Sequence, residues 1–389
     1  MKKLKNQQAG HFHIAFMMMV VLAVIVSVGV VTVRHVRHPS LASAEEQAQI
    51  IRATPAYDVM AKKAIFASNA SVFEPARIRT AYKVPATSTG SGTIAIIDAY
   101  DYPAAEQDLK FFNDFFALRS CTTANGCFEK HKMAAGLPID PGWETEMALD
   151  TQWAHAIAPT AKILLVEAKS NLISDFLDAI DYAKSRADVV AISMSWGANE
   201  FAFETTWDSR LVSTRGVAFT AAAGDSGNNV WWPAASPTVI GVGGTTLTLN
   251  GDDTIQSEVA WSSGGGGLSV YESEPAYQLN YNIPSASGSR GTPDVSYVGD
   301  PNTGLWIYSQ GSWWQIGGTS AGTPVWAALR AINSRVNLSN LYADGKSSNS
   351  AAFFRDITSG NNGGCGTYCD AGTGYDYVTG LGSPVSSRF

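Results

Sequence analysis

Residues 161–195, AKILLVEAKSNLISDFLDAIDYAKSRADVVAISMS, contain the pattern that decides the fold. The two ends, 161–168 and 189–195, are short apolar runs that suit strands buried on both faces of a parallel sheet. Between them the apolar residues recur at helical period on one face, at positions 173, 176, 177, 180 and 183. This stretch therefore predicts a strand, a crossover helix and a second, parallel strand.

The same alternation continues on either side of this unit. Residues 93–98 (TIAIID) and 217–223 (VAFTAAA) are further candidate buried strands, and residues 143–158 have a helical pattern, like residues 172–185 within the unit. Together they predict an α/β protein with a doubly wound, mostly parallel sheet flanked by helices. In such folds, sites form beyond the carboxyl ends of the strands.

Charge is distributed unevenly along the 389 residues. Residues 1–38 hold five of the 27 Lys and Arg residues and none of the 34 acids, so residues 39–389 carry 27 − 5 = 22 cations against 34 acids, a net −12. Phosphate binding needs clustered cations, so this composition argues against a nucleic-acid partner.

An apolar run of twenty residues, 14–33, follows three lysines and is long enough to span a bilayer. We interpret 1–13 as a basic cytoplasmic tail and 14–33 as a transmembrane anchor. The alternative is a signal segment, because Ala42-Ser43-Ala44 resembles a cleavage site. In either case the remainder is extracytoplasmic. Residues 34–72 are expected to form a stalk or a short pro-segment, with a helix-like stretch over 45–65, and residues 73–389 to form the main domain.

Four cysteines fit an oxidising compartment. They occur as two close pairs, Cys121 with Cys127 and Cys365 with Cys369. Four cysteines allow three connectivities, of which two local loops are the simplest. A zinc site is the rival interpretation, but histidines at ligand spacing are missing nearby.

A candidate nucleophile, Ser320, lies in GGTSAGTP at 317–324, before an apolar helical stretch. Small neighbours leave the hydroxyl accessible, and a backbone N–H at a helix N-terminus can receive an oxyanion. The plainer interpretation is a Ser/Thr N-cap with proline in the first turn.

No histidine is a convincing base for this serine. His131 lies in a Lys-His-Lys run and His155 in Trp-Ala-His-Ala-Ile, whereas the other four flank the apolar run. Carboxylates can replace the imidazole: Glu146 and Asp150 are four residues apart and project from one helix face. Packed together, they would share protons.

A third acid, Asp225, stands in AAAGDSG at the carboxyl end of a predicted buried strand. The plainer interpretation is a turn residue, since Asp-Ser-Gly suits turns. Subtilisin-like enzymes place an oxyanion-holding asparagine after a similar run. An aspartate can replace that donor only when it is protonated.

The ordered motifs resemble those of the serine-carboxyl peptidases, or sedolisins, which have a subtilisin-like fold. The matching patterns span about 73–389 and are Glu146-x-x-x-Asp150, Ser195-Trp196-Gly197, Gly224-Asp225-Ser226-Gly227 and Gly318-Thr319-Ser320. The resemblance implies an acid-active serine endopeptidase that forms an acyl-enzyme on polypeptide substrates. It assigns Ser320 as nucleophile, Glu146 as base and acid, Asp150 as its orienting partner and protonated Asp225 as oxyanion donor. Ser195, Trp196 and Gly197 would pair with substrate backbone.

The same resemblance implies one structural calcium ion. The family binds it through two aspartates twenty residues apart, an isoleucine carbonyl and two glycine carbonyls, and the matching residues here are Asp356, Ile357, Gly372, Gly374 and Asp376. These are hard oxygen ligands of the kind that Ca²⁺ prefers.

Two other functions remain as hypotheses. A catalytically inactive, surface-anchored binding module could keep this fold, although all four catalytic positions hold competent residues. An ordinary hydrolase could use His155, but that residue is five positions after Asp150 and about 140° away around a helix. We expect a monomer that meets the membrane only through its N-terminal segment.

Overall fold

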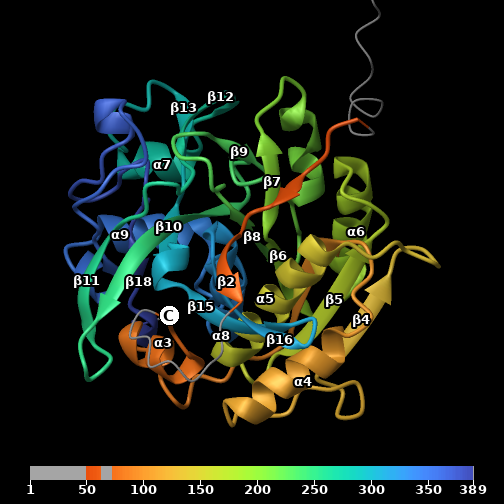
Figure 1. The fold of residues 1–389 in the computed structure, drawn as a ribbon. Helices are drawn as coiled ribbons and strands as arrows, with labels where there is room; N and C mark the ends of the chain where they lie inside the picture. The colour runs from red at the N-terminus through yellow and green to blue at the C-terminus, as the bar shows by residue number, and fades with distance from the viewer. Residues whose placement is uncertain (1–49, 63–71, 389) are drawn as a thin grey trace, which may run out of the picture. The chain divides into compact units, whose positions relative to one another are not determined.

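The computed structural model describes residues 50–62 and 72–388, and an eight-stranded sheet lies at its centre (Figure 1). In spatial order its strands are β11 (Ile255–Ala260), β10 (Ile240–Leu249), β8 (Ala218–Ala222), β6 (Val189–Met194), β3 (Thr93–Ala99), β5 (Lys162–Ala168) and β4 (Phe128–Lys132), with β14 (Val295–Val298) also paired to β10. Neighbouring strands from β10 to β4 are parallel, as is the β10–β14 pair, whereas β11 is antiparallel to β10.

The four strands expected from the sequence are β3, β5, β6 and β8, and each predicted end lies within one residue of the observed one. All seven residues of β3 are buried, as expected for a strand covered on both faces. The fold is therefore the predicted α/β class with a mostly parallel sheet.

Helices cover the sheet. They are α3 (Pro75–Ala81), α4 (Ala105–Phe115), α5 (Pro141–Ile157), α6 (Ile173–Ser185), α7 (Ala276–Tyr281), α8 (Thr323–Ile332) and α9 (Leu338–Lys346). The helices α5 and α8 pack against each other and against β3, and α6 packs against β3, β5 and β6. The predicted helices 143–158 and 172–185 correspond to α5 and α6.

Smaller sheets surround the central one. They pair β1 (Thr54–Pro55) with β7 (Trp196–Asn199) and β9 (Trp231–Trp232), β15 (Leu305–Ser309) with β16 (Ser312–Gly317) and β2 (Asp58–Lys62), β12 (Gly267–Ser273) with β13 (Ser289–Thr292), and β17 (Phe354–Arg355) with β18 (Ser383–Pro384). The helix predicted over 45–65 is wrong where it can be checked, because β1 and β2 lie there. Pairing with β7 and β16 overrides the local helical pattern.

The predicted basic tail, at 1–13, and the apolar run, at 14–33, lie outside the described residues. Within 50–62 and 72–388, no helix combines the length and the apolar character needed to cross a bilayer. The anchor or signal interpretation of 14–33 therefore stays a prediction.

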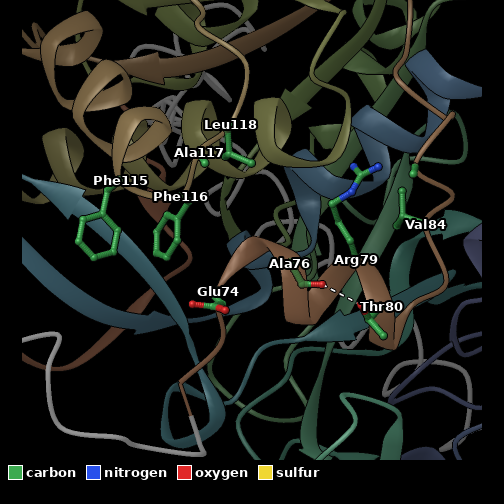
Figure 2. A pocket seen from close by; sticks show the side chains of 10 residues that line it. Glu74, Ala76, Arg79, Thr80, Val84, Phe115, Phe116, Ala117 and Leu118 are labelled. Atoms are coloured by element: carbon green, nitrogen blue, oxygen red, sulfur yellow. Dashed lines mark hydrogen bonds between the residues drawn. The ribbon is translucent and has the colours of Figure 1, made fainter.

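A surface cavity of about 570 Å³ lies between α3 and the end of α4 (Figure 2). Glu74, Arg79 and Phe116 are among the residues that line it. The Arg79 guanidinium donates to the carbonyls of Ala156 and Ile157, so it caps the carboxyl end of α5. None of the predicted catalytic residues lines this cavity.

Candidate active site

The two carboxylates of α5 face the interior of the protein. Asp140 caps the helix by accepting from the backbone N–H groups of Gly142 and Trp143, and Pro141 occupies the first turn. Glu146 and Asp150 lie one turn apart beyond this start and are both fully buried. Neither carboxylate therefore lies on a solvated face of the helix.

Burial raises the pKa of Glu146 well above its usual range, and the neighbouring carboxyls of Asp150 and Asp98 raise it further. Burial likewise raises the pKa of Asp150 well above its ordinary value, with Asp98 adding to the effect. Such groups cannot all ionise together, because each buried charge disfavours the next. They therefore share protons, and a protonated carboxyl can stabilise an ionised neighbour.

Ser320 lies in a short 3₁₀ turn, η3 (Thr319–Ala321), immediately before α8. Its side chain is fully buried, and its hydroxyl donates to the carbonyl oxygen of Ser195 at 3.2 Å. The Ser195 hydroxyl in turn donates to Asp150 at 2.8 Å. Ser195 thus connects the nucleophile candidate with the carboxylates of α5, which packs against η3.

No described residue forms a hydrogen bond of ordinary geometry with either Glu146 oxygen in this conformation. The Ser320 hydroxyl is nonetheless close enough to oppose, in part, the rise in the Glu146 pKa. Catalytic hydrogen bonds often tighten only when substrate is bound.

Asp225 approaches η3 from the end of β8. Its Oδ1 accepts from the Thr319 backbone N–H at 2.9 Å and from the Thr319 hydroxyl at 2.8 Å. Burial raises the pKa of Asp225 to about 7, against the lowering effect of these hydrogen bonds. Its Oδ2 is buried and has no partner among the residues described. Below pH 7 this oxygen can carry a proton and donate it.

Gly318 marks the position where these groups converge. Its φ of +108° favours glycine, and a Cβ there would lie 2.6 Å from Asp225 Oδ2 and 2.2 Å from the carbonyl oxygen of Ala56. The Ala56 oxygen accepts from the Ser320 backbone N–H at 3.0 Å. The Ala56 carbonyl therefore accepts from the Ser320 amide and lies on the same side of Gly318 as the Asp225 side chain.

Sequence reasoning missed Asp98, at the carboxyl end of β3. It is fully buried, and neither of its carboxyl oxygens has a partner within the described part of the chain. Burial raises its pKa well above the usual range, and Glu167 on β5 raises it further. The signal was available, because an acid at the end of a buried strand had already singled out Asp225.

His155 lies on α5 but away from Asp150. Its Nε2 forms a hydrogen bond with the Arg119 carbonyl at 2.6 Å, and burial lowers the pKa of the ring. The hypothesis of a histidine-based triad is therefore unsupported. The neighbouring Cys121–Cys127 disulfide and the Cys365–Cys369 disulfide have the predicted local connectivity.

The predicted calcium ligands come together in the C-terminal loop. The Asp356 carboxylate accepts from the Gly374 N–H, and Asp376 accepts from the N–H groups of Gly372, Val378 and Thr379. Neither aspartate forms a salt bridge with a described cation. Asp376 is buried and Asp356 is exposed, and carboxylate oxygens of this kind suit a hard divalent cation.

Comparison with known proteins agrees with this geometry. The model of the subtilase family of peptidases matches residues 142–340. Sedolisin from Pseudomonas sp. (strain 101) is 29% identical over 83% of this chain, and kumamolisin from Bacillus sp. (strain MN-32) is 33% identical over 82%. Tripeptidyl-peptidases also match, over shorter stretches.

A solved structure of Pseudomonas sedolisin, a serine-carboxyl proteinase complexed with two molecules of pseudo-iodotyrostatin, superimposes with a TM-score of 0.70 and 28% identity. The alignment covers 82% of this chain and 97% of that one. The chain belongs to the subtilase family and, within it, to the serine-carboxyl peptidases, or sedolisins. It spans 61% and 63% of the lengths of the two curated relatives above.

Proposed function

We propose that this chain is a serine endopeptidase that hydrolyses peptide bonds of polypeptides in acid. One observation carries the proposal: the Ser320 amide donates to a peptide carbonyl at Gly318, next to which the Asp225 carboxyl also lies, and Ser195 links Ser320 to buried Asp150, one helical turn from buried Glu146. Such a site has a nucleophile, a proton acceptor and two potential oxyanion donors.

Each side chain has one role in the proposed reaction. Glu146 accepts the Ser320 hydroxyl proton as Oγ attacks the carbonyl carbon, and returns the proton to the leaving amine. Asp150, held at Oδ1 by Ser195, carries the shared proton on Oδ2 and stabilises ionised Glu146. Protonated Asp225 and the Ser320 amide donate to the oxyanion. Water then hydrolyses the acyl-enzyme by the same proton transfers in reverse order.

The path of the chain through the site supports internal cleavage of polypeptides rather than removal of tripeptides from an end. β1 pairs with β7 on one side of Ser320, and β2 pairs with β16 on the other. A polypeptide can therefore extend in both directions from the reacting bond. The inactive binding module is the weaker alternative, because all four proposed catalytic side chains are present.

Digestion of a denatured protein at pH 4 tests this assignment. We expect internal peptides from the wild type and no hydrolysis by Ser320→Ala, with the exposed serine variant Ser257→Ala as a matched control. A ladder of tripeptides would replace the endopeptidase assignment with an exopeptidase one. Equal digestion by Ser320→Ala would contradict the nucleophile.

The cellular location that we propose for the peptidase domain depends on the N-terminal segment. We infer export of the peptidase domain, with membrane attachment through 14–33 or secretion after cleavage. Two disulfides support an oxidising compartment. We propose a monomer that has polypeptides as its partners and no nucleic acid.

We also propose one structural calcium ion in the C-terminal loop, held by the carboxylates of Asp356 and Asp376 and the carbonyls of Ile357, Gly372 and Gly374. The ion would neutralise the two aspartates and fix a loop that Cys365 and Cys369 brace. Its role is in stability, because the loop supplies none of the proposed catalytic groups.

Removing calcium should lower the melting temperature. At 1 mM ligand and a Kd near 10 µM, the stabilisation lost is about 2.7 kcal/mol, or several degrees. Differential scanning calorimetry with and without a chelator measures this shift. Asp376→Asn should lower the melting temperature and remove its response to calcium, whereas the exposed Asp114→Asn should keep the response. An unchanged wild-type melting temperature would contradict the site.

A further inference from the structure

The backbone around Ala56 shows where a polypeptide residue is held beside Ser320. The strand β1, which ends one residue before Ala56, pairs antiparallel with β7. The Ala56 N–H donates to the Ser195 carbonyl at 3.1 Å, and the Ala56 carbonyl accepts from the Ser320 backbone N–H at 3.0 Å. An extended peptide that adds a strand to a sheet edge is a recurring mode of recognition. Ala56 therefore marks the place of the P1 residue of a substrate, the residue that supplies the carbonyl of the scissile bond.

The side chain at this place lies in a small apolar cluster. Ala56 is 1% exposed and forms a cluster of three buried apolar residues with Ala222 and Trp231. Ala222, like Ala56, contributes only a methyl group, so the indole of Trp231 is the one large group in this cluster. The room available to a P1 side chain therefore depends on the indole.

The Trp231 indole lies against two glycines that border the site. Gly197 belongs to β7, the strand with which β1 pairs, and Gly224 directly precedes Asp225. A Cβ on Gly197 would lie 2.8 Å from Cε3 of the indole, and a Cβ on Gly224 would lie 2.7 Å from its Cδ2. Both distances are shorter than an ordinary carbon–carbon contact of about 3.5–4.0 Å. The ring therefore already fills the space that the missing side chains of these two glycines leave open.

The backbone of Trp231 is held in place by two sets of hydrogen bonds. The strand β9 pairs antiparallel with β7, with Trp231 opposite Asn199, and Figure 1 shows the two strands side by side. The Trp231 carbonyl also accepts from the Ala235 N–H at 2.9 Å. The side chain is 8% exposed, so moving it outward would expose a large apolar surface to water. The indole is therefore a fixed wall of the pocket.

We propose that Trp231 determines the P1 specificity of this enzyme and restricts it to glycine, alanine and other residues of similar size. This inference rests on the proposed peptidase function. An aromatic or branched aliphatic P1 side chain would have to displace the indole or draw the scissile carbonyl away from the Ser320 amide. That amide stabilises the oxyanion, so the misfit lowers kcat/KM. The substrates are thus unfolded polypeptides cut after small residues.

Internally quenched peptides that differ only at P1, with glycine, alanine, leucine or phenylalanine there, measure this preference at pH 4. For the wild type we expect kcat/KM on the alanine peptide to exceed that on the phenylalanine peptide at least about 100-fold, because one misfitting methylene already costs about 10–200-fold. Trp231→Ala should hydrolyse the phenylalanine peptide at least tenfold faster than the wild type does. It should lose less than tenfold on the alanine peptide, and Trp231→Phe should give an intermediate ratio.

Trp207→Ala is the matched control. Trp207 lies on η1 (Glu204–Leu211), is 6% exposed and packs against Phe201 and Trp232, outside the cluster that contains Ala56. Its replacement also removes a buried indole, but the ratio of the alanine to the phenylalanine peptide should stay that of the wild type. Melting temperatures of the variants show that each one is folded.

Digestion of a denatured protein gives a second readout that needs no variant. The wild-type cleavage sites, identified by mass spectrometry, should lie after alanine or glycine. Cleavage mainly after phenylalanine, tyrosine or leucine would overturn the inference and leave the peptidase function standing, as would a folded Trp231→Ala that keeps the wild-type ratio. Hydrolysis of neither the peptides nor the denatured protein would overturn the proposed function and the inference with it.

Discussion

Replacing Glu146 with glutamine should lower kcat on a denatured protein at pH 4 by about 10⁴-fold or more, because the amide cannot accept the Ser320 proton. The amide has nearly the size of the carboxyl, so the packing of α5 should survive. Since Glu146 contributes to the reaction rather than to the edge that pairs with substrate, KM should change little. Single-turnover kinetics on a labelled peptide would locate the loss in the acylation step.

Glu144→Gln is the matched control, because Glu144 lies two residues away on α5 and is only half-buried. It should keep nearly full activity. The double variant Ser320→Ala/Glu146→Gln should be no slower than either single variant, since the two groups act as a unit. A Glu146→Gln enzyme with near-normal kcat would remove Glu146 from the mechanism.

Activity should fall as pH rises through the pKa of Asp225, which is about 7. This pKa is raised above the ordinary value for aspartate, so the carboxyl is protonated and can donate below pH 7. Above pH 7 it ionises and repels the oxyanion. We expect kcat to decrease about tenfold per pH unit beyond that point, because kcat reports the pKa of groups in the enzyme–substrate complex.

Asp225→Asn should change the shape of this profile. The amide donates at every pH, so the ratio of kcat at pH 8 to kcat at pH 5 should rise at least tenfold over the wild-type ratio. Activity at pH 5 should fall, because the amide is a weaker donor than the acid and the Thr319 contacts must adjust. If kcat of Asp225→Asn fell at the same pH as kcat of the wild type, Asp225 would not be the group that limits activity at high pH.

The sheet and α5 could be predicted because their local patterns follow from burial. Strands buried on both faces leave continuous apolar runs, which is why β3, β5, β6 and β8 were identified nearly to the residue. The Glu146–Asp150 pair could be predicted because a spacing of four places two side chains on one helix face.

The path of Ala53 to Asp58 could not be predicted, because it depends on pairing with distant segments. β1 has two residues and no pattern of its own, and its partner β7 lies more than 140 positions later in the chain. Local propensity in this Ala-rich region favours a helix, yet the paired edges β7 and β16 determine its conformation. The Ala56 carbonyl beside Ser320 is visible only once those edges are placed.

The most direct test of carboxyl-based catalysis is a crystal structure of the enzyme at pH 4 with a peptide aldehyde bound. We predict a bond from Ser320 Oγ to the aldehyde carbon, with a Glu146 oxygen at hydrogen-bond distance from Oγ, about 2.6–3.2 Å. The former aldehyde oxygen should lie between the Ser320 amide and an Asp225 oxygen. An adduct in which Glu146 and Asp225 stay out of contact with these atoms, or in which His155 reaches Ser320, would contradict the account.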